Sequence, residues 1–295
     1  MKFLRFIISL RFWLIMGTTV LVLLIATNFF NPALDREEIR AAFENLEHQP
    51  DFFALGDSLE GQIAGFHIGD SSKTPLLVVH GSPGSMSDWV PFMAQSGVLD
   101  SYRVIAIDRP GYGETTVQSG LNLAAQSAAL RPVVDTYFKN NPGVVAGHSF
   151  GGALVLQLMS DYPKAFPKSL TVAGTVAPQD QEPRWYNYLM RYTPVAWIVN
   201  PLFVTSNKEM WTLADDLSRL YAEPKKLHGK LALVQGKRDI LVDWPSAELA
   251  ARHFSGEDSK VFLEEERNHF IIWTDYPLIM SALEWLQKDG SPAVE

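Results

Sequence analysis

Short apolar runs alternate with helix-forming stretches along most of this 295-residue chain, and this alternation constrains the fold more than any other feature. Six runs have the composition of buried strands: residues 75–81, 102–108, 143–147, 168–176, 230–236 and 260–264. Helical patterns lie between most of them, over 121–138, 151–160, 244–253 and 277–287. Strands that alternate with helices form mostly parallel sheets covered by helices on both faces. The sequence therefore predicts an α/β fold, with residues 63–68 in a leading antiparallel hairpin and a kink or helix start at Pro132.

A long segment, residues 177–228, interrupts this alternation between the fourth and fifth runs. It contains eight aromatic side chains: Trp185, Tyr186, Tyr188, Tyr192, Trp197, Phe203, Trp211 and Tyr221. A structureless loop of this length is uncommon, so the segment is predicted to be a helical lid set on the strand ends. The aromatic side chains then either form the lid's own core or present an apolar surface to a substrate.

The chain begins with a segment typical of a membrane-spanning helix. Residues 12–30 carry no charge and are mostly apolar, and Lys2, Arg5 and Arg11 precede them. About 20 such residues span a bilayer core, and positive charge before the span keeps the N-terminus in the cytoplasm. We therefore expect an uncleaved anchor in residues 1–34, with the following domain on the outer (periplasmic or extracellular) side of the membrane. A cleaved signal peptide and a buried or interfacial helix are the alternatives.

The rest of the chain has the size and charge of one acidic domain. Residues 35–50 are predicted to form an exposed helical linker that begins at Asp35, and residues 51–295 form the domain. The whole chain has a net charge of −8, and without its first three basic residues 22 basic and 33 acidic residues remain, or −11. This balance argues against nucleic acid as a partner. Because the chain has no cysteine, disulfides, thiolate metal sites and a cysteine nucleophile are excluded.

Ser149 stands at the centre of the sequence G-H-S-F-G, which follows one predicted strand and opens a predicted helix. In such a strand–turn–helix setting a serine adopts a strained backbone that lifts its hydroxyl clear of the sheet. Gly147 and Gly151 are needed because the strand and the helix pass too closely for side chains. The pattern predicts a nucleophile, and the alternative is a serine that caps the helix.

A serine nucleophile needs a base, and the base needs a carboxylate to orient it. His269 lies just past the last predicted strand, on the sheet edge where Ser149 also emerges. Asp239 follows the fifth strand at the same edge, with Asp243 as the alternative. The other histidines are less suited: His253 lies within a helical pattern, and His80 is expected to brace the loop that follows it.

The negative charge that develops on a substrate oxygen needs two fixed N–H donors. The backbone N–H of Phe150, directly after the serine, is expected to supply one. The backbone N–H of Ser82, in the turn H-G-S-P-G-S after the first long strand, is expected to supply the other.

Five motifs together resemble the α/β-hydrolase family: HGSPGSMSDW, DRPGYGET, GHSFGG, GKRDILV and NHF, in this order over residues 55–290. The HGxPG form is similar to the lidded branch that holds esterases, proline iminopeptidases, epoxide hydrolases and C–C bond hydrolases. The chain departs from the family where GET stands, since a serine often follows GYG. The resemblance implies the α/β-hydrolase fold with a lid, and chemistry that uses no metal and no cofactor.

The serine at position 149 indicates acyl chemistry, because relatives that open epoxides carry an aspartate there. The expected activity is hydrolysis of a small apolar carboxylic ester through an acyl-enzyme. A proline-iminopeptidase type of aminopeptidase is an alternative, with Glu182 or Asp180 as partner for the substrate amine. A thioester hydrolase, a C–C bond hydrolase and a non-catalytic, membrane-anchored interaction protein are the others.

Overall fold

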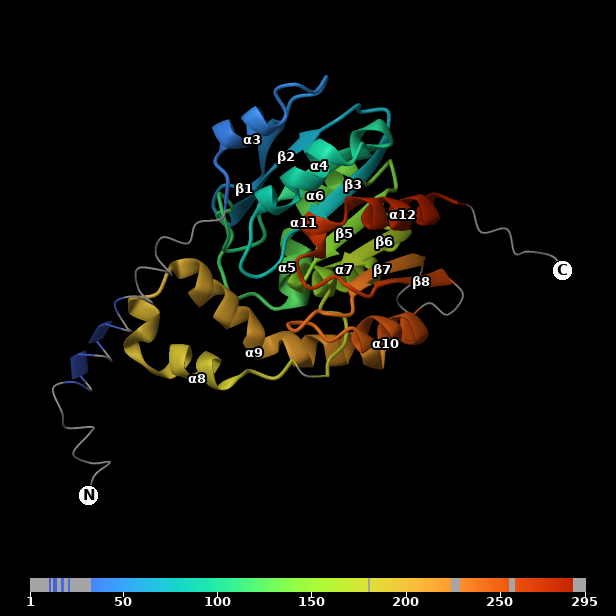
Figure 1. The fold of residues 1–295 in the computed structure, drawn as a ribbon. Coiled ribbons are helices and arrows are strands. Elements are labelled where there is room, and N and C mark those ends of the chain that lie inside the picture. Colours follow the sequence, from blue (N-terminus) through green and yellow to red (C-terminus); the bar gives the residue numbers. More distant parts are fainter. Residues whose placement is uncertain are drawn as a thin grey trace.

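The computed structural model describes residues 33–179, 181–223, 229–254 and 258–288, together with six isolated positions between 11 and 21. Its centre is an eight-stranded sheet in the order β1-β2-β4-β3-β5-β6-β7-β8 (Figure 1). The strands are β1 Asp51–Asp57, β2 Gly61–Ile68, β3 Thr74–Val79, β4 Tyr102–Ile107, β5 Val144–His148, β6 Lys168–Val172, β7 Lys230–Gly236 and β8 Ser259–Glu264. The β1–β2 and β2–β4 pairs are antiparallel and the other pairs are parallel. The predicted α/β fold with its mostly parallel sheet and leading hairpin is confirmed.

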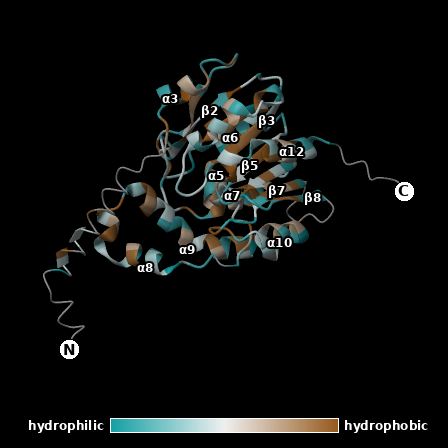
Figure 2. Cartoon of the chain, viewed as in Figure 1, coloured by the Kyte–Doolittle hydropathy of each residue, from teal (hydrophilic) through white to brown (hydrophobic). Residues whose placement is uncertain are grey.

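Helices cover both faces of this sheet (Figures 1 and 2). One face packs against α5 (Leu123–Ala129), α6 (Arg131–Tyr137), α7 (Phe150–Asp161) and α10 (Pro245–Phe254). The other packs against α3 (Arg36–Ala42), α4 (Val90–Gln95), α11 (Ile271–Thr274) and α12 (Tyr276–Gln287). Short 3-10 turns η1 (Met86–Trp89) and η2 (Val98–Asp100) flank α4. The sheet is thus buried on both faces, as its continuous apolar strands require.

Pro132 marks a helix start, one of the two outcomes expected for it. The stretch predicted as a helix over 121–138 is divided between α5 and α6, which meet at Leu130. Proline is tolerated in the first turn of a helix, where its missing N–H costs no hydrogen bond. The division therefore follows from proline chemistry.

The segment expected as an exposed linker contains α3, and this helix is docked on the domain. Asp35 caps it with a capping box, as the sequence suggests. However, the side chains of Ile39 and Phe43 are fully buried, and the Phe43 ring lies 6.3 Å from that of Phe66 in β2. The helix is exposed on one side only.

Among the described residues, no helix is both long and apolar enough to cross a membrane. The segment predicted as an anchor, residues 12–30, lies mostly outside the described residues.

The predicted lid segment is mostly helical over the residues that the structure describes, after a non-helical stretch that ends at Arg184. It contains α8 (Trp185–Tyr192), the 3-10 turn η3 (Pro194–Trp197) and the long helix α9 (Pro201–Ala222). Figure 1 shows α8 and α9 together at one end of the molecule, with α9 next to the sheet layer. Leu213, Leu217 and Leu220 anchor α9 in the same core as α7.

Candidate active site

Ser149 lies in a backbone conformation that residues other than glycine rarely adopt. Its φ is 53° and its ψ is −121°, between the end of β5 and the start of α7. The strand and the helix approach so closely that a Cβ on Gly147 would lie 2.3 Å from the carbonyl oxygen of Gly151. Ser149 makes no side-chain capping bond to α7, so the capping alternative is wrong. Strain of this kind costs about 1–3 kcal/mol and is concentrated at functional sites.

A chain of two hydrogen bonds joins Ser149 to His269 and Asp239. The Ser149 Oγ lies 3.0 Å from His269 Nε2, and His269 Nδ1 lies 2.8 Å from Asp239 Oδ2. The three residues are far apart in sequence, but each follows the carboxyl end of a parallel strand, and these ends meet at one edge of the sheet. Asp239 and the alternative carboxylate, Asp243, both line an adjoining cavity, but the hydrogen bond to His269 is made by Asp239.

The surroundings of Asp239 keep its carboxylate ionised. Burial alone would raise its pKa, but hydrogen bonds from His269 and from the backbone N–H groups of Val242 and Leu241 outweigh burial and lower it. Gln235 donates a further hydrogen bond of 3.0 Å to Asp239 Oδ2. A fixed, ionised carboxylate in contact with Nδ1 can orient the imidazole and stabilise its protonated form.

The two predicted oxyanion donors lie beside Ser149. Ser82, Phe150, Ser149 and His269 line one cavity of about 230 Å³. Gly81 comes so close that a Cβ there would lie 3.1 Å from the Ser149 Cβ. Among the described residues, neither the Ser82 nor the Phe150 backbone N–H has a hydrogen-bond acceptor. Both N–H groups therefore remain candidates for the oxyanion donors.

Comparison with known families agrees with this arrangement. The model of the family described as "Alpha/beta hydrolase family" matches residues 76–282. The chain belongs to the alpha/beta hydrolase family.

Solved structures share the fold of this alpha/beta hydrolase. A carboxylesterase from Bacillus subtilis aligns with a TM-score of 0.64 at 15% identity, over 86% of this chain and 96% of its own. A structure described as a membrane phospholipase A aligns with a TM-score of 0.64 at 16% identity, over 98% of this chain and 100% of its own.

A curated relative, the proline iminopeptidase of Lactobacillus crispatus, is 25% identical over 138 residues, which are 42% of this chain and 44% of the relative. The chain spans less than half the length of the curated relatives compared with it.

A buried carboxylate of the lid segment, Glu209, forms an ion pair with Arg109 in the loop after β4 and a hydrogen bond with Ser82 in the loop after β3. Glu209 of α9 is 1% exposed, and its Oε1 lies 2.5 Å from Arg109 Nη1. Its Oε2 accepts hydrogen bonds from Ser82 Oγ at 2.6 Å and from the Tyr112 hydroxyl at 2.8 Å. Gln126 donates to Oε1 at 3.1 Å. The carboxylate is thus fully satisfied, as a buried charge must be.

Arg109 also holds the loop after β3, which contains Ser82. Its Nε donates to the carbonyl oxygen of His80 at 3.1 Å, and its Nη2 donates to that of Gly81 at 2.8 Å. The His80 ring accepts from the Arg109 backbone N–H at 3.0 Å and contacts Gly81 O through Nδ1 at 2.8 Å. Burial and the nearby Arg109 lower the pKa of His80 well below its usual range, so the ring is neutral. His80 therefore braces the loop, as the sequence indicated.

Three residues that support the site were not predicted from the sequence: Glu209, Arg109 and His148. The His148 Nε2 lies 3.1 Å from the carbonyl oxygen of His269 and donates to it. Burial lowers the pKa of His148 to about 3, so this ring is a neutral support for the His269 loop. One signal for Glu209 was available: it precedes Leu213, Leu217 and Leu220 at helical spacing, which places a carboxylate on the apolar face of α9.

The stability of the fold should depend on pH through Asp88. Its carboxylate lies against Gly84, in the loop after β3 that also contains Ser82. Burial raises the pKa of Asp88 to about 7, despite a hydrogen bond from the Ser85 backbone that acts in the opposite direction. In the unfolded chain this carboxyl ionises near pH 4, so between about pH 4 and 7 the folded state binds more protons. Stability from this group is therefore full at low pH and is lost as pH rises through about 7.

Asp88→Asn should reduce the decline in melting temperature between about pH 5 and 8, because the amide stays neutral throughout. Thermal unfolding at a series of pH values measures the slope. Asp100→Asn, at an exposed carboxyl, is the control and should keep the wild-type slope. Equal slopes for Asp88→Asn and wild type would contradict the role assigned to Asp88.

Proposed function

We propose that the protein is a serine hydrolase that cleaves a carboxylic ester through an acyl-enzyme. The observation that carries this proposal is the hydrogen-bond chain from Ser149 Oγ through His269 to Asp239, with distances of 3.0 and 2.8 Å. A hydroxyl is a weak nucleophile by itself, and an imidazole within hydrogen-bond reach activates it. The strained backbone at Ser149 supports the same role.

The proposed reaction has two halves. His269 Nε2 takes the Ser149 proton as Oγ attacks the ester carbonyl, and Asp239 stabilises the imidazolium. The N–H groups of Ser82 and Phe150 bind the oxyanion of the tetrahedral intermediate. His269 then protonates the leaving alkoxide as the C–O bond breaks. In the second half, His269 removes a proton from water, the hydroxide attacks the acyl carbon, and the acid leaves as Ser149 regains its proton.

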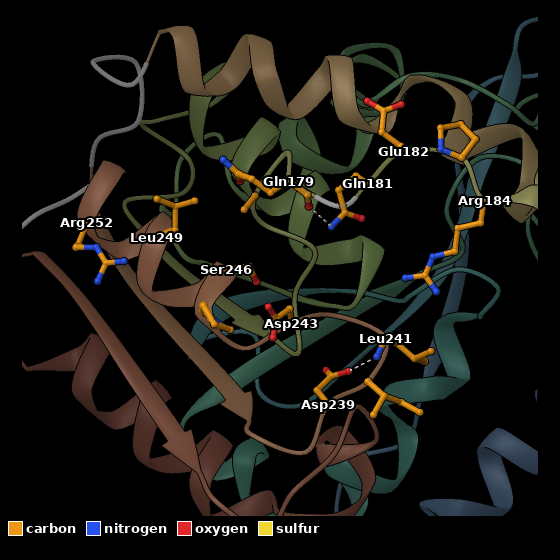
Figure 3. Close-up of a pocket in the computed structure, with 14 residues that line it drawn as sticks. Gln179, Gln181, Glu182, Arg184, Asp239, Leu241, Asp243, Ser246, Leu249 and Arg252 are labelled. Carbon is orange, nitrogen blue, oxygen red and sulfur yellow. Dashed lines mark hydrogen bonds between the residues drawn. The ribbon is translucent and has the colours of Figure 1, made fainter.

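The size of the cavity favours a small acyl group. It holds about 230 Å³, and Phe150, Met210 and Leu213 supply part of its apolar wall. A second cavity of about 890 Å³ adjoins it and shares Glu182, Arg184 and Leu241 among its lining residues. Figure 3 shows Glu182 and Arg184 on one side of the larger cavity and Asp243 and Ser246 on the other. We propose that this outer cavity admits substrate to Ser149.

An aminopeptidase is the second candidate, because Glu182 lines the Ser149 cavity and its carboxylate could bind a substrate ammonium group. The similarity to a proline iminopeptidase favours the same possibility. Asp180, the other carboxylate considered, lies outside the described residues.

A fluorophosphonate probe and a substrate panel together test these proposals. The wild type should react covalently with the probe, and Ser149→Ala should not. An unlabelled, folded wild type would contradict the hydrolase proposal and favour a non-catalytic interaction protein. Turnover of p-nitrophenyl esters should exceed that of prolyl anilides and acyl thioesters. Faster anilide turnover that Glu182→Gln abolishes would replace the esterase proposal with the aminopeptidase.

We further propose that residues 12–30 anchor the protein in a membrane, with the hydrolase domain on the outer side. The support is the uncharged run of 19 residues behind three basic ones. External protease should digest the domain in intact cells, or in spheroplasts if an outer membrane is present. Digestion only after the inner membrane is permeabilised would contradict this orientation.

A further inference from the structure

The helix α8 exposes its apolar side chains to solvent. Four of them follow helical spacing at i, i+3, i+4 and i+7: Trp185, Tyr188, Leu189 and Tyr192, which are 76%, 49%, 43% and 69% exposed. The buried residue of this helix is instead polar, Asn187, which donates to Asn207 of α9. An amphipathic helix normally buries its apolar stripe, so the orientation of α8 is the reverse of the usual one. Trp197 and Ile198 in the following turn are 87% and 46% exposed and extend the surface.

We call these six side chains the lid aromatic face: Trp185, Tyr188, Leu189, Tyr192, Trp197 and Ile198. They do not line the Ser149 cavity, in which Tyr186 is the lining aromatic residue of α8. Tyr188 and Tyr192 contact the Trp211 ring within the lid, but all six side chains stay at least 43% exposed. The two roles foreseen for the lid aromatics, a buried lid core and a wall of the substrate site, therefore do not explain their exposed surface. An apolar surface of this kind typically marks a contact with another phase or another molecule.

The charges of this segment indicate what the contact is. Residues 183–208 contain no aspartate or glutamate and three basic residues (Arg184, Arg191 and Lys208), in a chain of net charge −8. Arg191 lies at the rim of the face, with its guanidinium 4.2 Å from the centre of the Trp211 ring. Tryptophan and tyrosine are enriched at membrane–water interfaces, and basic side chains bind anionic lipid headgroups. The combination fits a lipid bilayer better than an acidic or neutral protein surface.

The chain also enters the domain at the edge nearest the lid. The backbone N–H of Leu34 donates to Ser87 Oγ in η1, which follows the carboxyl end of β3. Ser149 lies at the same edge of the sheet, because β3 and β5 are parallel neighbours. The apolar run of residues 12–30 is thus joined to the domain by a short segment on the lid side.

We propose that the lid aromatic face lies on the surface of an anionic lipid bilayer. The contact would orient the domain so that α8, whose residues Tyr186 and Asn187 line the Ser149 cavity, faces the membrane. If the proposed ester hydrolase activity holds, on which this consequence rests, the enzyme draws its ester from the lipid phase.

The absence of cysteine allows a direct test, because one introduced cysteine is the sole site for a thiol-reactive fluorophore. The full chain carries the environment-sensitive dye NBD at Trp197→Cys or, as control, at Leu46→Cys, an exposed leucine that precedes β1 at the opposite edge of the sheet. Each protein is reconstituted in phosphatidylcholine vesicles with and without phosphatidylglycerol, and with nitroxide-labelled lipid as quencher. At position 197 we expect a blue shift and strong quenching that weakens without phosphatidylglycerol, and at position 46 neither effect.

Two outcomes would overturn the proposal. Quenching at position 197 that is as weak as at position 46 would show that the face does not contact lipid. A blue shift at position 197 without lipid quenching, together with disulfide-linked dimers of the unlabelled Trp197→Cys protein, would assign the face to a second copy of the chain.

A kinetic test separates this inference from the proposed activity. Replacing both Trp185 and Trp197 with serine should lower hydrolysis of a vesicle-embedded ester by roughly tenfold or more, because two interfacial side chains are lost. Turnover of a soluble ester should stay at the wild-type value. If wild type hydrolyses neither ester, the proposed function fails while the quenching result still decides the surface. Equal loss on both substrates would contradict the membrane role.

Discussion

Replacing Ser149 with alanine is expected to lower kcat for a soluble p-nitrophenyl ester by roughly 10⁴- to 10⁶-fold. The acyl-enzyme cannot form without the hydroxyl, and only the oxyanion donors and substrate binding are left to accelerate attack by water. The KM should change little, because Oγ contributes mainly to the transition state. Alanine keeps the Cβ, so the strained backbone and the melting temperature should stay close to those of wild type.

The residues of the hydrogen-bond chain should act as one unit. His269→Ala should lower kcat by a similar factor, and the double variant Ser149→Ala/His269→Ala should be no slower than either single variant. Asp239→Asn should cost roughly 10⁴-fold, since the amide no longer stabilises the imidazolium or selects its tautomer. Additive losses in the double variant, or a loss below tenfold for Ser149→Ala, would contradict the roles proposed here.

Replacing Glu209 with alanine should lower the free energy of unfolding by about 3–5 kcal/mol. The change leaves the buried guanidinium of Arg109 without its counter-charge and removes the acceptor for the Ser82 and Tyr112 hydroxyls. Urea unfolding of the full chain measures this loss. Asp215→Ala is the matched control, because Asp215 is an exposed carboxylate on the same helix and its removal should change stability by no more than about 0.5 kcal/mol.

The Arg109–Glu209 pair should also be coupled to the loop after β3, which contains Ser82. The double variant Arg109→Met/Glu209→Met should lose less free energy of unfolding than the sum of the losses in Arg109→Met and Glu209→Met. In the double variant neither charge is left buried without its partner. Below its unfolding temperature, Glu209→Ala should show a lower kcat with little change in KM, since Glu209 holds Ser82, whose backbone N–H is the proposed oxyanion donor. Equal unfolding midpoints for Glu209→Ala and Asp215→Ala would contradict this account.

The local sequence was enough to predict the sheet, most of its helices and the three residues of the hydrogen-bond chain, Ser149, His269 and Asp239. Continuous apolar runs define strands that are buried on both faces, and the positions directly after such strands converge at one edge of a parallel sheet. Ser149, Asp239 and His269 all occupy such positions, so their proximity followed from strand pattern alone. Gly147 and Gly151 marked the close approach of strand and helix in the same way.

Three features depend on contacts between segments that are distant in the sequence: the identity of the carboxylate that pairs with His269, the Arg109–Glu209 pair and the orientation of α8. Asp239 rather than Asp243 pairs with His269, because its Oδ2 lies 2.8 Å from His269 Nδ1. The positions of the two aspartates in the chain do not determine this distance. The Arg109–Glu209 pair joins residues 100 positions apart, and the packing of α9 against α5 and α7 turns that carboxylate inward. The periodicity of α8 determines that the helix has an apolar stripe, but the direction of the stripe depends on what the neighbouring helix offers. Here α9 presents Asn207 to α8, and Asn187 faces inward. Tyr188 and Tyr192 contact the Trp211 ring of α9 at one edge only, so the aromatic side chains of the stripe stay largely exposed.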